Sequence, residues 1–555
     1  MTGGIGVGKT HLVQWEVREI CNELGLMVYP WHPGSGSDLK AKFNEFVSIE
    51  LPRMPRPIVL LPDADLGPDD LPDALSASGA QVVIVSRDPG RWRHRAAVVE
   101  VGAFARAESI AFLTRHQASL TPQDAAQVAE HLSDLPLALA QAVSHIRSDD
   151  TAESFLRRLR SQARVVFGTG GTDWYQSTLA VEIRRAMDSL PATGPPSPFD
   201  VLGALALMDG GPYPLSALGR GLRRSSWRSA GTWLPTDRQV PPHRLTMAFR
   251  ALGQHGLARV GADEVQLDWL TAQVVRCLLE SSERCSAGLL AESMLLGTVS
   301  AGRGLAEWED WPSWELSARP LMSIDPEHVT SLQGRYALLA AVHYTLEQGR
   351  ADEARGRLLQ LKSVWHRAGD TSREGLARTC DLLARAGLEL GYVKDAREHA
   401  ETAFRESRSV HGIGHPDTIA SALTWAMAAE RVDWLPELKA LADGVPDHRL
   451  ALRIDSAMAR FELRSSHGPR PVAALQRIVQ EQIDILGEEH PDTLSSRHLL
   501  ACAYAESGQA NAAVDEFARV LRGRISTLGI GHPRTEETRA ALRCPRESLP
   551  PQTTD

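Results

Sequence analysis

A repeat with a period of 42 residues runs through the second half of this 555-residue chain. His490 and His532 each open a His-Pro turn 42 residues apart, and Gly349 and Gly391 have the same spacing. From Gly391 to Gly508 the spacing is 117 residues, which fits one full unit and two units that together run short. A period of this length in alanine- and leucine-rich sequence predicts stacked helix pairs, because a single pair cannot bury its own apolar face.

Each unit is expected to be two helices joined by a tight turn at the glycine, with alanines such as Ala396 and Ala403 allowing close helix contact. The stretch LGEEHPDTL, followed by ACAYAESGQANAAVDEFARVL, resembles the long tetratricopeptide repeats of kinesin light chains. We expect about five repeats over 333–545, preceded by a helical spacer over 286–332 and followed by a disordered polar tail over 546–555. The resemblance implies a surface that binds a protein or peptide partner.

The chain opens with a complete phosphate-binding motif, GxxxxGK[ST], written here as GGIGVGKT. The motif runs into an amphipathic stretch over 11–24, which predicts a loop that begins a helix. Glycines let backbone N–H groups converge on a phosphate at the helix N-terminus, the lysine neutralises the β- and γ-phosphates, and the threonine ligates magnesium. The predicted site for ATP or ADP with Mg²⁺ comprises Gly3, Gly4, Ile5, Gly6, Val7, Gly8, Lys9 and Thr10.

A second magnesium ligand is expected at the end of the apolar strand Ile58 to Leu61, since magnesium near phosphates is held by one or two carboxylates. We assign Asp63 to this role, with Asp65 as the alternative if Pro62 shifts the register. The residue after Asp63 is Ala64, at a position where fast phosphate-loop ATPases usually have a carboxylate that positions the attacking water. Slow ATP hydrolysis is therefore expected.

The first 104 residues alternate short apolar runs with helical patterns, which predicts a parallel α/β sheet. The strand QVVIVSR ends at Ser86 and Arg87, and because α/β sheets bind ligands at strand ends, Arg87 is a candidate contact for the γ-phosphate. Taken alone, a solvated arginine is the commoner arrangement. Residues 105–190 are expected to form a small helical lid, and residues 191–285 a winged-helix-like domain with its wing in LARVGADEVQLDWL.

The order GGIGVGKT, LLPDAD, VVIVSRD, LSDLPLALAQA, winged-helix-like segment and repeats resembles the NB-ARC branch of the STAND ATPases. The resemblance implies that Ser86 and Arg87 form the first sensor. It also implies that Pro136, in the family's GLPLA motif, lies nearest the nucleotide base, with Asp134 replacing the motif's glycine. The family's winged helix ends in a histidine that contacts the β-phosphate. Asp268 stands there instead, and a carboxylate would repel a phosphate, so no site residue is assigned from that motif.

Only Met1 and Thr2 precede the phosphate-binding motif, although such a loop normally follows a central β-strand. We expect that the chain begins late, because a sheet without that strand leaves backbone groups unpaired on its neighbours. The neighbours are taken to be the strands that end at Asp63 and Arg87.

Whole-chain properties narrow the class of protein. The formal net charge of −9 argues against nucleic acid as the main partner, and the six cysteines form no CxxC pair, which fits a reducing cytoplasm. No apolar run reaches the ~18 residues that indicate a membrane span. His415, His490 and His532 could suggest a metal site, but each lies in a His-Pro turn before a helix, so a structural role is favoured.

Three functions remain in competition. The first is a nucleotide-dependent signalling switch, closed with ADP and opened or self-associated with ATP, whose repeats bind a protein partner. The second is a repeat scaffold with a degenerate nucleotide domain. The third is a transcription regulator, for which RGLRRSSWR over 220–228 offers a basic cluster, although a solvated helix face explains that cluster better in an acidic chain.

Overall fold

The computed structural model folds as two compact units, Met1–Thr298 and Val299–Asp555, and each is described by itself. The residues that the structure describes are 2, 5–9, 12–13, 15–16, 19, 23, 28–30, 45–53, 58–61, 79–86, 92–147, 149–168, 178–208, 211–224, 242–298, 311–367, 372–445, 448–464 and 471–543. Among them, no helix is both long and apolar enough to cross a membrane.

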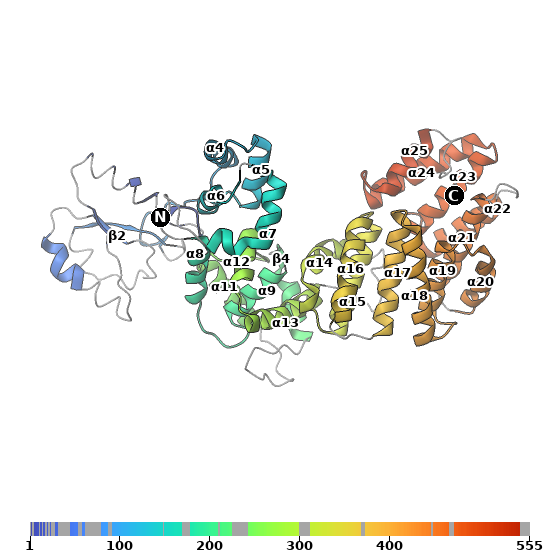
Figure 1. Ribbon diagram of the computed structural model, residues 1–555, viewed down its shortest axis with the longest axis horizontal. Helices are drawn as coiled ribbons and strands as arrows, with labels where there is room; N and C mark the ends of the chain where they lie inside the picture. The colour runs from blue at the N-terminus through green and yellow to red at the C-terminus, as the bar shows by residue number, and fades with distance from the viewer. Residues whose placement is uncertain are drawn as a thin grey trace. The chain divides into compact units, whose positions relative to one another are not determined.

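A small parallel sheet opens the first unit (Figure 1). It contains β1 (Val28–Pro30), β2 (Ile58–Leu61) and β3 (Gln81–Ile84), in the spatial order β1-β2-β3. All four side chains of the central strand β2 are buried, as expected for an uninterrupted apolar strand that is covered on both faces. Two short helical segments, η1 (Phe46–Glu50) and η2 (Leu51–Arg53), precede β2 and contribute to the core beside it.

Thr2 lies on the far side of β3, where it forms parallel bridges with Ser86 and with Glu100. Its backbone N–H donates to the carbonyl of Val99 at 2.8 Å, and its carbonyl accepts from the N–H of Val101 at 2.7 Å. β2 and β3 pair directly with each other over four residue pairs. The expectation that the strand before the loop separates these two strands is therefore wrong: its described residue lies between β3 and the segment around Glu100.

A helical region follows the sheet. Its helices are α4 (Arg106–His116), α5 (Pro122–His131), α6 (Pro136–Val143), α7 (Ala152–Gly168) and α8 (Leu179–Asp188). Apolar side chains of these helices, among them Leu113, Val128 and Phe155, are completely buried. The side-chain oxygens of Thr121 and Thr178 cap the N-termini of α5 and α8, which satisfies backbone N–H groups that the helices cannot pair internally.

The rest of the first unit combines helices with a three-stranded antiparallel sheet of order β4-β6-β5. The elements are α9 (Pro198–Leu207), β4 (Tyr213–Pro214), α10 (Leu215–Arg224), α11 (Pro242–Gln254), β5 (Arg259–Val260), β6 (Glu264–Gln266), α12 (Trp269–Leu278) and α13 (Ser281–Thr298). A strand between the first two helices, followed by a third helix and a hairpin, is the arrangement of a winged helix. α13 packs closely on α9, where a Cβ added to Gly203 would lie 2.9 Å from the Cβ of Ala287. Packing therefore extends beyond residue 285, to Thr298.

The second unit is a series of helices placed side by side (Figure 1). Its described elements are α14 (Trp311–Ser323), η5 (Pro326–His328), α15 (Leu332–Glu347), α16 (Ala351–Arg367), α17 (Arg373–Glu389), α18 (Val393–His411), α19 (Pro416–Ala428), η6 (Val432–Trp434), α20 (Leu435–Asp443), α21 (His448–Arg464), α22 (Val472–Leu486), α23 (Pro491–Glu506), α24 (Ala510–Leu528) and α25 (Pro533–Arg543). From α15 to α24 the described helices form five pairs, and α25 follows them. α20 has only nine residues, which accounts for the shortened spacing in the middle of the repeat.

The turns between paired helices have the geometry that the glycines predicted. Gly349, Gly391 and Gly508 have φ angles of 74°, 78° and 75°, in the left-handed region that glycine tolerates best. The predicted alanine contacts are present as well. Ala396 is completely buried, and a Cβ added to Gly387 would lie 3.1 Å from the Cβ of Ala396. The helices of the pair α17 and α18 thus come close together at small residues.

Candidate functional site

The loop over 5–9 has two glycines in left-handed conformations, with φ of 78° at Gly6 and 86° at Gly8. Lys9 begins helical backbone and is 8% exposed. The N–H of Leu12 donates to the carbonyl of Gly8 at 2.8 Å, which is the i to i+4 bond of a helix that starts at the loop. The described half of the motif is therefore a glycine turn that leads directly into a helix, as the sequence predicted.

The loop contacts the beginning of α6. The N–H of Leu137 donates to the carbonyl of Gly6 at 3.1 Å, and the preceding residue, Pro136, is buried at the first position of the helix. A Cβ added to Gly6 would lie 3.3 Å from Cδ1 of Leu179, at the start of α8, so the loop fits closely against both helices. The structure thus brings together two predicted site residues, Gly6 and Pro136, that are far apart in the sequence.

Asp134, just before α6, occupies a backbone position that favours glycine. Its φ is 54°, and that of Ser133 is 56°. Aspartate tolerates the left-handed region better than most residues, and here its carboxylate is held by Arg106 through bonds of 3.0 Å and 2.8 Å. Its carbonyl accepts from the N–H of Phe104 at 3.0 Å. The aspartate therefore keeps the turn that a glycine would form and adds an ion pair to it.

Gln141 is a buried residue of this region that the sequence analysis did not single out. It lies one turn after Leu137 on α6 and is 2% exposed. Its Oε1 accepts from the N–H of Leu179 at 3.0 Å, which joins α6 to the start of α8, while its Nε2 has no hydrogen-bond partner among the described residues. A single glutamine in an apolar helix gives no sequence signal for such a role, because burial depends on tertiary packing.

Asp268 is the helix cap of α12. Its Oδ1 accepts from the N–H of Thr271 at 2.9 Å, and its Oδ2 accepts from the hydroxyl of the same residue at 2.6 Å. Both oxygens are therefore engaged in starting the helix.

The remaining predicted site residues lie outside the described part of the chain: Gly3, Gly4, Thr10, Asp63, Asp65 and Arg87. Ser86 is described; it is 6% exposed and bridges to Thr2. The described geometry thus covers the glycine turn, Lys9 and the contact with α6. Both magnesium ligands and the sensor arginine stay predictions.

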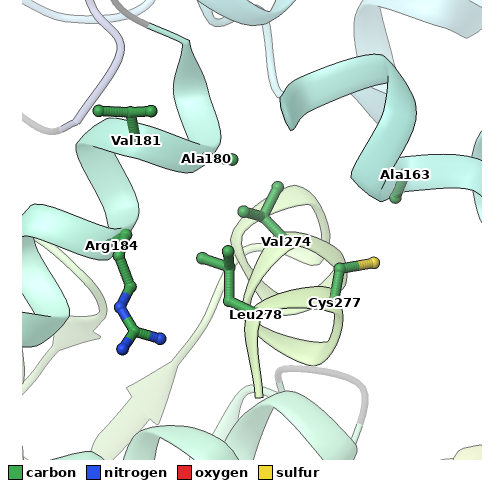
Figure 2. Close-up of a pocket in the computed structure, with 7 residues that line it drawn as sticks. All are labelled: Ala163, Ala180, Val181, Arg184, Val274, Cys277 and Leu278. Atoms are coloured by element: carbon green, nitrogen blue, oxygen red, sulfur yellow. The ribbon is translucent and has the colours of Figure 1, made fainter. Parts of the chain in front are cut away.

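In the described part of the first unit, the structure shows two cavities with mainly apolar linings. One, of about 520 Å³, is bordered by Thr2, Val83 of β3, Leu12, Trp92 and Val98. The other, of about 250 Å³, lies between α7, α8 and α12 (Figure 2). Its lining is apolar except for Arg184, which pairs with Asp188 in its own helix at 3.0 Å. Besides Thr2, the lining of the larger cavity includes the polar residues Glu16 and Ser86, and we assign no ligand to either cavity.

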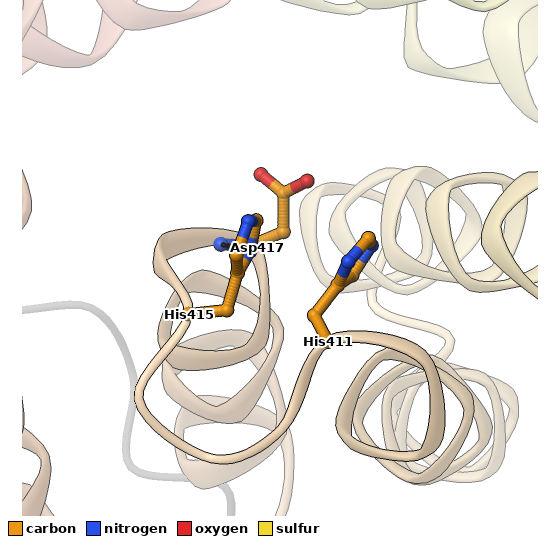
Figure 3. Close-up of side chains that lie close together, drawn as sticks. All are labelled: His411, His415 and Asp417. Carbon is orange, nitrogen blue, oxygen red and sulfur yellow. Dashed lines mark hydrogen bonds between the residues drawn. The ribbon is translucent and has the colours of Figure 1, made fainter.

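His411, His415 and Asp417 lie close together in the second unit (Figure 3). The two rings are stacked, with centroids 4.3 Å apart, and Nδ1 of His415 accepts from the N–H of Asp417 at 3.2 Å. A neutral ring that accepts at Nδ1 carries its proton on Nε2, so neither nitrogen offers a lone pair to a metal ion. Asp417 also pairs with Arg378 at 3.3 Å. These contacts make His415 the cap of the turn that begins α19.

All three His-Pro turns of the repeats share this cap. Nδ1 of His490 accepts from the N–H of Asp492 at 3.1 Å, and Nδ1 of His532 accepts from the N–H of Arg534 at 3.1 Å. The structural role predicted for these histidines is confirmed, and the capping atom is the histidine nitrogen itself. The proline that follows suits the first helical position.

Comparison with known proteins identifies the repeats. A tetratricopeptide-repeat family model matches residues 493–534, which confirms the prediction of such repeats. No curated protein sequence matches the chain. Among solved structures, the kinesin light chain TPR-like repeats of Podosopora anserina are 24% identical and cover 36% of this chain and 97% of their own, with a TM-score of 0.28.

A second solved structure extends over nearly the whole chain. It is a Signal Transduction ATPase with Numerous Domains (STAND) protein with a tetratricopeptide repeat sensor, from Pyrococcus horikoshii. It is 12% identical and covers 98% of this chain and 82% of its own, with a TM-score of 0.33. With TM-scores this low, neither structure establishes a common fold for the whole chain. The repeats themselves indicate a protein-interaction function.

Proposed function

We propose that the protein is a nucleotide-dependent signalling switch, which binds ATP or ADP with Mg²⁺ at the loop over 3–10 and binds a protein partner through its repeats. The observation that carries the proposal is the hydrogen bond between the carbonyl of Gly6 and the N–H of Leu137. Through it the phosphate-binding loop contacts the helix whose first residue, Pro136, the NB-ARC resemblance places nearest the base. A nucleotide bound at the loop would therefore contact the helical region as well.

The described residues fit a phosphate group. Gly6 and Gly8 have the left-handed conformations that let backbone N–H groups converge, and Lys9 stands at the first turn of the helix, where the helix dipole also favours an anion. In the proposed site Lys9 neutralises phosphate charge, while Thr10 and Asp63 hold the magnesium ion. The metal would supply charge neutralisation at the phosphates. Ala64 provides no carboxylate for the attacking water, so we expect slow hydrolysis, as suits a switch.

The test is a thermal shift with nucleotide. A ligand that binds only the native state stabilises it by about 2.7 kcal/mol at a hundredfold excess over Kd. Magnesium-ATP should raise the melting temperature of the wild type and of Arg115→Ala, an exposed control in α4. It should not raise that of Lys9→Ala. Equal shifts in wild type and Lys9→Ala would refute the site, and no shift in any variant would favour a repeat scaffold without nucleotide control.

A further inference from the structure

The last helix of the repeat unit returns to its first helix pair. Nε2 of His532 lies 3.0 Å from the carbonyl oxygen of Glu347, although the two residues are 185 positions apart. A Cβ added to Gly349, in the turn after α15, would lie 2.5 Å from Cδ of Pro533. The start of α25 is therefore seated against the turn between α15 and α16.

Arg534 occupies the centre of this contact. Its Nη1 donates to Oε2 of Glu347 at 3.3 Å, and its Nη2 donates to Oε1 of Glu389 at 2.9 Å. The two carboxylates stand at the ends of α15 and α17, the first helices of neighbouring repeats. A planar guanidinium can bridge two carboxylates with separate N–H groups, which the point charge of a lysine cannot do with the same geometry.

Two carboxylates and two arginines are in direct contact at this site: Glu347 pairs with Arg385 and Arg534, and Glu389 pairs with Arg534. Glu347 also accepts from Arg385, and Nε2 of His343 lies 3.5 Å from the same carboxylate. Burial lowers the pKa of His343, so this ring is neutral at pH 7. Among the described residues, Glu389 forms its ion pair with Arg534. Two carboxylates and Arg385 alone would leave an excess negative charge in a partly enclosed site.

The ion pair between Glu347 and Arg534 is partly shielded from water, which raises the cost of leaving one of its charges unpaired. The side chains of Glu347 and Arg534 are 13% and 30% exposed. Burial alone would raise the pKa of Glu347, but the hydrogen bond with His343 and the charges of Arg385 and Arg534 hold it well below its usual value. Removing one partner of such a pair leaves a charge without compensation, which is costly where water is partly excluded. A cation of guanidinium shape can therefore pair with both carboxylates at once.

We propose that Glu347 and Glu389 form an arginine-recognition site for partners of the repeats, and that Arg534 of the same chain fills this site when the repeat unit is closed. A partner that presents an arginine competes with Arg534 and releases the last helix. The proposal rests on the protein-binding role of the repeats and names the chemistry of the partner. It does not depend on nucleotide binding.

The first test is hydrogen exchange in the full chain. Arg534→Ala should speed exchange of the amides over 347–350 and 389–392 at least tenfold, because these turns lose the helix seated on them. Arg539→Ala is the matched control, since Arg539 lies on the same helix and pairs with Glu536 within it. Unchanged exchange at both turns in Arg534→Ala would overturn the proposal, because the contact would then be absent in solution.

The second test measures the binding of a fluorescent (Arg-Ser)4 peptide. A fluorescent (Lys-Ser)4 peptide, which has ammonium groups in place of guanidinium groups, is the control. The arginine peptide should bind Arg534→Ala at least tenfold more tightly than wild type, and the lysine peptide should show no such gain. Adding Glu389→Gln should abolish the gain, whereas adding Glu536→Gln, which removes an exposed carboxylate of α25, should preserve it.

Two results would contradict the competition directly. One is equal affinity of the arginine peptide for wild type and Arg534→Ala. The other is a gain that survives Glu389→Gln. Because neither test contains nucleotide, their failure would remove the arginine site and leave the proposed switch untouched. Loss of the magnesium-ATP shift in Lys9→Ala would have no bearing on the arginine site.

Discussion

At the scale of single residues, Glu430 marks the place where the repeat is hardest to read in the sequence. It follows α19, at the position taken by glycine in the neighbouring turns, and its φ of 53° places it in the left-handed region. Left-handed backbone costs a residue with a Cβ roughly 1–2 kcal/mol. The helix pair forms nevertheless, because Leu435 and Leu438 of α20 are buried in the core beside it.

Glu430→Gly should therefore stabilise the repeat unit by about 0.5–1 kcal/mol. The substitution relieves the backbone strain, and part of this gain is offset because glycine gives the unfolded chain more conformational freedom. Its exposed pair with Arg464, at 3.8 Å, adds little to the native state. Urea denaturation followed by helical circular dichroism measures the change. Gly508→Ala is the converse control: a Cβ there would meet nothing within 4 Å, so its cost should be conformational. A destabilised Glu430→Gly would contradict this account.

Asp268 gives a second prediction for one residue. Asp268→Ala removes both acceptors that start α12 and should lower the free energy of unfolding by about 1 kcal/mol, the usual value of such a cap. Asp268→Asn keeps an acceptor oxygen at the same place and should lose much less. The measurement is thermal unfolding of the full chain with both variants, and equal losses would mean that the charge, rather than the cap, is what stabilises this position.

At the scale of elements, the sequence predicted helices and strands where periodicity or a motif was strong. The run Ile58 to Leu61 became β2, and the turns at Gly349 and Gly391 became left-handed turns. The pairing of β2 with β3 was missed, because strand order depends on contacts that a linear pattern does not record. The contact of Gly6 with Leu137 could not be predicted for the same reason. Each residue belongs to a motif that the sequence shows, but the sequence does not show that the two motifs are in contact.

His498 of α23 and His532, the residue before α25, predict how stability depends on pH. Burial and the charge of Arg524 lower the pKa of His498 to about 4, and burial also lowers that of His532. The unfolded chain would take up these protons below pH ~6.5, while the folded unit resists them, so stability is lost as pH falls from about 6.5 towards 4. His498 alone accounts for roughly 3 kcal/mol over this window.

The variant His498→Gln should flatten that loss, because it removes one proton-binding site from the unfolded chain. His448→Gln, at an exposed position, serves as the control and should leave the slope unchanged. Urea unfolding at several pH values between 7 and 4 gives the slopes. If His498→Gln is as sensitive to acid as the wild type, the buried ring is not the source of the dependence.

At the scale of the whole molecule, the chain divides into two compact units at Thr298. Solenoid repeats are stabilised mainly by their neighbours, so a fragment over 299–555 should remain strongly helical by circular dichroism without the first unit. It should also melt at a temperature that does not change with magnesium-ATP. A disordered spectrum would show that the repeats need the first unit in order to fold.

The seating of α25 on the turn after α15 has a consequence for the number of repeats. A stack of helix pairs with two free ends can gain or lose a pair without geometric penalty, because no contact joins its first pair to its last. Here the ends meet, through His532 and Glu347. One pair more or fewer would displace the last helix by the width of two helices, each about 8–10 Å. Arg534 could not span that gap, so the array has a fixed circumference, and duplication or deletion of one 42-residue unit would break the ring.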